Sequence, residues 1–235
     1  MKKLFLVISL MSISYAGYSQ WSFGLKQGLN LSRISYTPHF ELGQNYIKQD
    51  YKRGYCGGLV IQYFNAKYLG IQAEVLYSDK GFMTKYDTLN NTQYERDIPY
   101  LTIPVMTHFY ILNKKTSPFL LFGGFASMAL SSRETFTDHH LSGSVSYSFL
   151  RNRDNRGDYG LVGGAGIKRK FSFGTLQIQA EYSYSFNNLY KWGYQSNNPD
   201  FDRFFKIPQE ALNQAITFSL TYLFTLKPKT SHPAH

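Results

Sequence analysis

The chain has 235 residues, of which 17% are aromatic, a single cysteine and a formal net charge of +10. This length fits one domain, and one cysteine excludes a framework of intramolecular disulfide bonds. The basic residues come without a recognition helix or a base-stacking motif, so we expect no nucleic-acid binding.

The N-terminus has the order of a secretory signal peptide. Two lysines precede an apolar run over Leu4–Met11, and small residues follow at Ala16 and Ser19. We predict cleavage after Ser19, with cleavage after Ala16 as the alternative, so residues 1–19 form the signal peptide. Both this run and the later apolar stretch Pro118–Leu130 are shorter than the about 20 residues that a transmembrane helix needs. Any insertion into a membrane must therefore use strands.

Eight segments alternate with a period of two, which is the pattern of strands whose successive side chains point to opposite faces. In chain order they are Trp21–Ser32, Gly54–Phe64, Tyr68–Lys80, Ile98–Ile111, Phe119–Leu130, Tyr159–Arg169, Leu176–Phe186 and Gln214–Phe224. The seventh, L-Q-I-Q-A-E-Y-S-Y-S-F, is the clearest, with its apolar residues on one face and its polar residues on the other. The fifth is apolar on both faces, so its facing is left unassigned. Pro104, inside the fourth segment, predicts a local bulge because proline cannot donate a hydrogen bond to the sheet.

The connections between these segments fall into two classes that alternate along the chain. The short ones are Asn65–Lys67, Leu112–Pro118 and Lys170–Gly174, and the long ones are Arg33–Arg53, Gly81–Asp97, Ser131–Asp158 and Asn187–Asn213. Short periplasmic turns that alternate with long extracellular loops are typical of an outer-membrane barrel. We therefore predict an all-β, eight-stranded antiparallel up-and-down transmembrane barrel over residues 20–226, with both termini in the periplasm and a polar periplasmic tail over residues 227–235. A secreted soluble β-domain is the alternative.

Charged residues on the inward faces predict how the interior is filled. Eight strands enclose a space that side chains alone can fill, so an open pore is not the default. Lys26, Glu74, Lys168 and Glu181 should all point inward, and buried charges need partners. We predict that these four form an ion network in the lumen, with a proton or ion pathway as the alternative.

A second set of charges gathers at the predicted periplasmic end, where the turns and the tail contain no acidic residue. The eight cations of this basic rim are Lys67, Lys114, Lys115, Lys168, Arg169, Lys170, Lys227 and Lys229. Cations at a membrane surface are attracted to anionic lipids. We therefore expect the rim to meet either anionic phospholipid headgroups or an acidic periplasmic partner, and a merely solvated rim is the alternative.

The sequence offers little chemistry for an enzyme. His108 should face the lumen, and Asp138, His139 and His140 follow one another in a long loop. No nucleophile, base and orienting group come together, and the loop run has no second cluster at a metal-ligand spacing. We expect no catalysis, no cofactor and no metal, with a lipid-modifying enzyme as the least favoured reading.

Five stretches of the chain carry a family resemblance. They are G-L-K-Q-G-L-N-L-S (Gly24–Ser32), Y-L-T-I-P-V (Tyr100–Val105), P-F-L-L-F-G-G (Pro118–Gly124), G-L-V-G-G-A-G (Gly160–Gly166) and Q-A-E-Y-S-Y-S (Gln179–Ser185). In this order they resemble the PorT-like outer-membrane β-barrel family of Bacteroidetes. The resemblance covers essentially the whole mature chain, implies the barrel fold and brings no catalytic residue; the founding member is linked to the type IX secretion system.

The expected role is a structural or interaction protein of the cell envelope, with a link to protein secretion or surface assembly. A narrow channel or transporter for small solutes is the alternative. The expected partners are outer-membrane lipids, the barrel assembly machinery during biogenesis and an envelope or secretion-system protein.

Overall fold

Eleven strands form one antiparallel sheet in the described part of this computed structural model. The described residues are 20–36, 47–64, 68–86, 92–112, 114–137, 142–147, 153–191 and 211–225. The predicted signal peptide over residues 1–19 and the predicted tail over residues 227–235 lie outside them. Within the described ranges, no helix is both long and apolar enough to cross a membrane.

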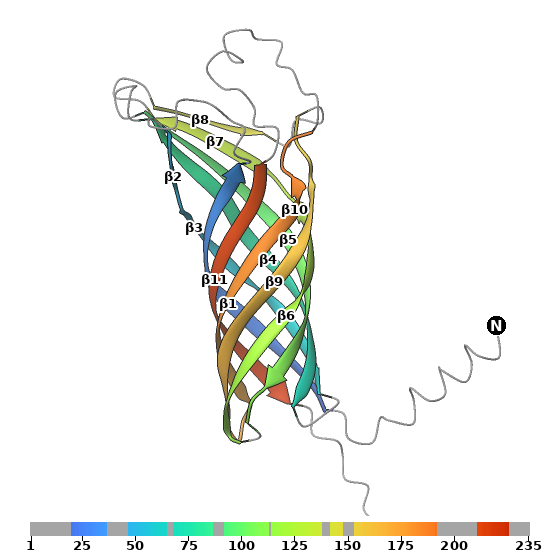
Figure 1. Cartoon of the computed structure of the whole chain (residues 1–235). Coiled ribbons are helices and arrows are strands. Elements are labelled where there is room, and N and C mark those ends of the chain that lie inside the picture. Colours follow the sequence, from blue (N-terminus) through green and yellow to red (C-terminus); the bar gives the residue numbers. More distant parts are fainter. Residues whose placement is uncertain are drawn as a thin grey trace, which may run out of the picture.

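Eight of the strands close into a ring. They are β1 (Gln20–Tyr36), β3 (Lys52–Phe64), β4 (Leu69–Tyr86), β5 (Thr92–Tyr110), β6 (Thr116–Ala129), β9 (Gly157–Lys170), β10 (Thr175–Asn188) and β11 (Ala211–Thr225). Their order is β4-β3-β1-β11-β10-β9-β6-β5, and pairing of β5 with β4 closes the barrel (Figure 1). Every pairing is antiparallel, and the first and last strands pair directly with each other. The predicted eight-stranded antiparallel barrel is confirmed.

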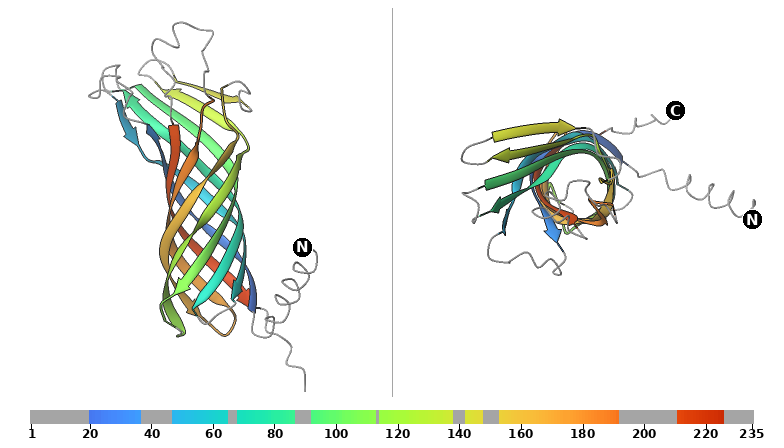
Figure 2. Two further views of the ribbon diagram at one scale, coloured as in Figure 1. Left: turned by 45° about the vertical axis from the view of Figure 1, so that its right-hand side comes forward. Right: turned by 90° about the horizontal axis from the view of Figure 1, so that it is seen from above.

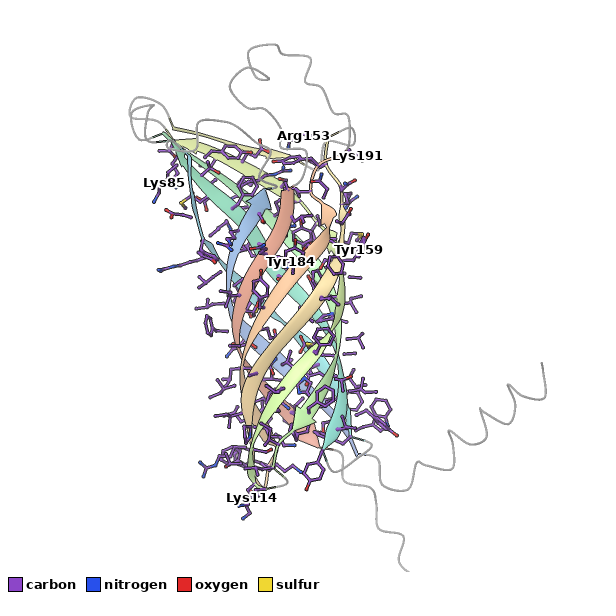
Figure 3. All side chains as sticks on the ribbon, viewed as in Figure 1. Lys85, Lys114, Arg153, Tyr159, Tyr184 and Lys191 are labelled. Carbon is purple, nitrogen blue, oxygen red and sulfur yellow. The ribbon has the colours of Figure 1, made fainter. Side chains whose placement is uncertain are left out.

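The alternation in the sequence becomes an alternation between the outside and the inside of the wall. In β1, Leu25 and Leu29 are exposed, whereas Lys26 and Asn30 are buried in the interior. The same alternation holds around the ring, so the outer wall carries a mainly apolar belt, which Gln27 of β1 interrupts. Figure 3 shows side chains that project outward from the wall. Most buried polar side chains point to the inside of the barrel, so the apolar side chains next to them along each strand point outward.

The fifth predicted segment, whose facing was left open, sends aromatic residues to both sides. In β6, Phe119, Leu121 and Phe125 are buried in the interior, while Leu120 and Phe122 are exposed on the outside. The inward residues join an apolar layer that runs from the end of the barrel with the short turns, called here the short-turn end, toward the middle of the interior. Its members are Met106, Tyr110, Phe119, Leu121, Phe125 and Val162, with Phe64 packed against them.

A second apolar layer lies at the opposite end, called here the long-connection end, and reaches into the outer sheet described below. Its members are Ile34, Phe82, Ile98, Tyr100, Ala129, Leu189, Tyr190 and Ala211, with Tyr94 packed against them. Apolar layers thus lie at both ends of the interior.

The long connections contain more strand than the sequence predicted. The chain adds β2 (Ile47–Asp50), β7 (Ser132–Thr137) and β8 (Ser142–Tyr147), and β4 and β5 continue past the ring. Together they form a sheet with the order β2-β4-β5-β7-β8, called here the outer sheet. It projects to one side of the long-connection end (Figure 2). The predicted loops Gly81–Asp97 and Ser131–Asp158 were therefore wrong in part, since cross-strand pairing continues from Phe82↔Arg96 to Tyr86↔Thr92.

Two backbone features shape the wall. Gly81 has a φ of 155°, and an added Cβ atom would lie 1.9 Å from the carbonyl oxygen of Arg96, so only glycine fits here, where β4 enters the outer sheet. The bulge predicted at Pro104 is absent from the pairing of β4 with β5. The register is the same at Ala73↔Val105 and at Leu76↔Thr102, so the proline removes a donor without adding a residue to the strand.

Candidate functional site in the barrel interior

Three charged side chains meet in the middle of the interior. Lys26 of β1 lies between Glu74 of β4 and Glu181 of β10, and all three are buried. The Lys26 Nζ atom is 2.9 Å from Glu74 Oε2 and 2.8 Å from Glu181 Oε1, and it donates hydrogen bonds to both carboxylates. Because β4 and β10 lie opposite each other in the ring, this triad spans the interior from wall to wall.

Two glutamines complete the surroundings of the triad. Gln72 Nε2 donates to Glu74 Oε1 over 2.5 Å, and Gln179 Nε2 donates to Glu181 Oε1 over 2.8 Å. Each glutamine lies two residues before its glutamate, so both point to the same inward face. Two carboxylates therefore share one ammonium group and two amide donors. Removing the ammonium group would leave two buried negative groups facing each other.

Lys168, predicted as the fourth member of the network, lies elsewhere. Its side chain points inward, but its Nζ atom sits 3.0 Å from the ring centroid of Tyr110 and 4.9 Å from that of Phe64. None of the carboxylates described in the structure lies within 4 Å of it. Lys168 thus makes cation–π contacts in the apolar layer at the short-turn end, because it lies at a different depth from the triad.

A small cavity lies beside the triad, toward the long-connection end. It has a volume of about 40 Å³, and its lining includes Glu181, Cys56, Lys80 and Phe125. The Lys80 Nζ atom lies 4.8 Å from the ring centroid of Phe125 and is a polar group in the wall of the cavity. A space of this size holds a few water molecules. It is far too small for a hydrated solute.

His108, weighed above as a residue for enzyme chemistry, is fully buried near the short-turn end. Its ring stacks on Phe119 with centroids 4.9 Å apart, and its Nδ1 atom is 3.4 Å from the hydroxyl of Tyr110 and 3.5 Å from Gln62 Nε2. These contacts favour a packing role. Asp138, His139 and His140 lie outside the described residues. In the part of the chain that is described, no group of three or more His, Cys, Asp or Glu side chains could hold a metal ion.

The structure contains an ion network at the long-connection end that the sequence patterns did not predict. Arg96 Nη2 is 3.0 Å from Asp154 Oδ1, and Arg153 Nη2 is 2.9 Å from Glu134 Oε1. Arg153 also contacts Asp154, and the Arg96 guanidinium lies 5.6 Å from the Tyr190 ring centroid. Burial opposes the charge on Arg153, but the hydrogen bond to Asp154 and the negative charges of Glu134 and Asp154 together outweigh burial and raise the pKa of the guanidinium. The network ties β5, β7 and the segment before β9 together.

The predicted basic rim is only partly within the described residues. Lys67, Lys227 and Lys229 lie outside them, and Lys168 points into the lumen. The four others, on the two neighbouring turns that follow β5 and β9, are exposed: Lys114, Lys115, Arg169 and Lys170. Figure 3 shows Lys114 at the tip of the short-turn end.

Comparison with known proteins gives a family and a set of similar folds. Residues 13–191 match the family described as outer membrane protein beta-barrel domain. Similar solved structures include Ail, the attachment invasion locus protein of Yersinia pestis, with 15% identity, 87% of this chain and 99% of that chain covered, and a TM-score of 0.40. They also include the outer membrane protein OprG of Pseudomonas aeruginosa, with 14% identity, coverages of 88% and 95%, and a TM-score of 0.44.

A further similar structure is the outer membrane protease OmpT of Escherichia coli, with 12% identity, coverages of 88% and 96%, and a TM-score of 0.37. No curated protein matches the sequence.

Proposed function

The chain belongs to the outer membrane protein β-barrel domain family, and from this premise we propose that it is a closed barrel that presents its outer sheet to a partner protein. Family membership places it in the outer membrane. We propose that the short turns and both termini face the periplasm, so that the outer sheet is extracellular. The alternation of short turns with long connections supports this orientation.

The main support for a closed lumen is the triad of Lys26, Glu74 and Glu181. It joins opposite walls of the barrel through contacts of 2.8 and 2.9 Å. A passage for ions would have to break these contacts, which would leave buried charges unpaired. The apolar layers at both ends add two further barriers. This arrangement supports a structural or interaction role over the alternative of a narrow channel.

Conductance in planar bilayers tests the closed lumen. The purified, folded protein should give no steady current above the lipid baseline, because the triad and the apolar layers fill the cross-section. Insertion is checked in the same preparation by the shift in gel mobility between heated and unheated samples. A repeatable unit current from inserted protein would contradict the proposal and support the channel.

The outer sheet supports the interaction role. Within the described residues, β8 and β2 are its two end strands, and each has one edge without a paired strand. An unpaired edge presents backbone N–H and C=O groups that can pair with an extended segment of another protein. The ion network of Arg96, Glu134, Arg153 and Asp154 fixes β7, and hence β8, on the barrel. The sheet is therefore a fixed platform and a suitable surface for a partner.

Photo-crosslinking in intact cells tests the platform. A photoreactive residue at Ser144 or at Val145 of β8 should give a discrete adduct with another protein, and both positions are used because successive residues of a strand point to opposite faces. The same residue at Leu161, on the outer wall, is the matched control and should give no such adduct. Equal adducts at all three positions, or none at β8, would contradict the interaction role.

We also propose the narrower assignment to the PorT-like barrels of Bacteroidetes, with a role in protein secretion or surface assembly. The five motifs from Gly24–Ser32 to Gln179–Ser185 support it. The identity of the protein captured at β8 would test the assignment, since a component of a secretion or surface-assembly system is the expected result.

A further inference from the structure

Four exposed cations form one patch at the short-turn end, although they come from two separate turns. Lys114 and Lys115 precede β6, and Arg169 and Lys170 end β9. The two turns are neighbours because β6 pairs with β9, with Thr116 opposite Arg169. The backbone N–H of Lys170 donates to the carbonyl oxygen of Lys115 over 2.8 Å, which fixes the two turns together. The patch is therefore built by the fold.

The position of Arg169 sets the depth of this cationic patch. On β9 the outward column runs through Tyr159, Leu161, Ala165 and Ile167, and Arg169 is its next member. Its side chain is exposed on the outer wall, one step beyond the apolar belt. A cation at this place lies where hydrocarbon gives way to lipid headgroups. A soluble periplasmic protein would contact the tip of the turn before it reached Arg169 on the outer wall, so this position suits a lipid better than a soluble protein.

Exposed aromatic rings accompany the cationic patch. The guanidinium of Arg169 lies 5.4 Å from the ring centroid of Phe171, and Phe171 stacks on Phe173 with centroids 5.2 Å apart. Phe173 is 68% exposed, which is unfavourable in water. Aromatic side chains are enriched at the level of the headgroups in membrane barrels. The rings thus indicate that this turn sits in the lipid interface.

The charges of the patch are not balanced by the protein around them. The turn sequences L-N-K-K-T-S-P and K-F-S-F-G contain no acidic residue. Among the carboxylates that the structure describes, none lies within 4 Å of the four cations. An external anion is the natural counter-charge for such a group.

We propose that Lys114, Lys115, Arg169 and Lys170 bind the phosphate groups of anionic phospholipids in the inner leaflet of the outer membrane. The guanidinium of Arg169 takes a phosphate at the edge of the apolar belt, where its planar donors suit two phosphate oxygens. The three lysines add attraction from the turns around it. This inference rests on the orientation proposed above, but it is independent of whether the lumen conducts and of what binds the outer sheet.

Native mass spectrometry of the folded protein tests the site, with phosphatidylglycerol and phosphatidylethanolamine offered together in one detergent. The wild-type chain should retain phosphatidylglycerol in preference to phosphatidylethanolamine. Each cation near an anionic surface contributes roughly fivefold in affinity. The pair Arg169→Gln/Lys170→Gln should therefore reduce the preference by at least about fivefold, and Lys114→Gln/Lys115→Gln should reduce it less because these side chains are farther from the belt.

The matched control removes two exposed cations at the other end of the barrel, with Arg53→Gln/Lys191→Gln. It changes the net charge by the same amount and should leave the lipid preference unchanged. An unchanged preference in both patch variants, or an equal loss in the control, would overturn the proposal. Capture of an acidic periplasmic protein by a patch without any lipid preference would also overturn it. Folding of each variant is verified by its gel mobility before heating.

Discussion

Replacing Lys26 with methionine is expected to lower the free energy of unfolding of the barrel by about 3–5 kcal/mol, the cost of removing one partner from a buried ion pair. Glu74 and Glu181 would then face each other across the interior without the ammonium group that now lies 2.9 and 2.8 Å from them. Urea titration in detergent, read from the gel mobility of unheated samples, gives this free energy.

A second variant separates the loss of charge balance from the loss of packing. The triple change Lys26→Met/Glu74→Gln/Glu181→Gln removes all three charges and keeps acceptors for the amides of Gln72 and Gln179, so it should recover most of the lost stability. Lys85→Met is the control for an exposed pair. Lys85 lies 2.6 Å from Asp50, with side chains 43% and 35% exposed, and should cost no more than about 1 kcal/mol. If Lys26→Met cost no more than Lys85→Met, the lumen would be hydrated and the closed barrel would be contradicted.

Whether each side chain of a strand points into or out of the barrel could be predicted from the sequence. The depth of each residue along the barrel axis could not. Lys26, Glu74, Lys168 and Glu181 all have inward parity, and all four point inward. Which of them meet depends on the stagger between strands, which alternation does not encode. In the structure Lys168 pairs across the strands with Gln177, closer to the short turns, and reaches the rings of Tyr110 and Phe64 instead.

Most of the outer sheet could not be predicted, for a different reason. Strand prediction by alternation depends on one face being apolar, as in the wall of the barrel. The continuation of β5, T-Q-Y-E-R-D, and the strand β7, S-R-E-T-F-T, are polar on both faces. Their pairing is stabilised by the backbone and by the contacts of Arg96 with Asp154 and Glu134, which connect residues far apart in the sequence. Such contacts produce no periodic pattern in the sequence.

Replacing Leu59 with arginine is expected to destabilise the barrel by about 2–4 kcal/mol, the cost of a cation at the bilayer midplane on a lipid-facing strand position. Leu59 lies on the outward face of β3, 63% exposed, midway between Tyr55 and Tyr63. An arginine there would have to carry its charge into the hydrocarbon. The measurement is again urea titration, now of protein folded into lipid vesicles.

Tyr55→Arg is the matched control, because it introduces the same charge on the same face of the same strand. Tyr55 lies nearer the long-connection end, where an arginine reaches the headgroups and should cost only about 0–1 kcal/mol. The dependence on depth is what distinguishes lipid from other surroundings. In water, both arginines would be tolerated equally because both positions are exposed. Equal stabilities of the two variants would therefore contradict a lipid-facing wall, and with it the depth argument that places Arg169 among the headgroups.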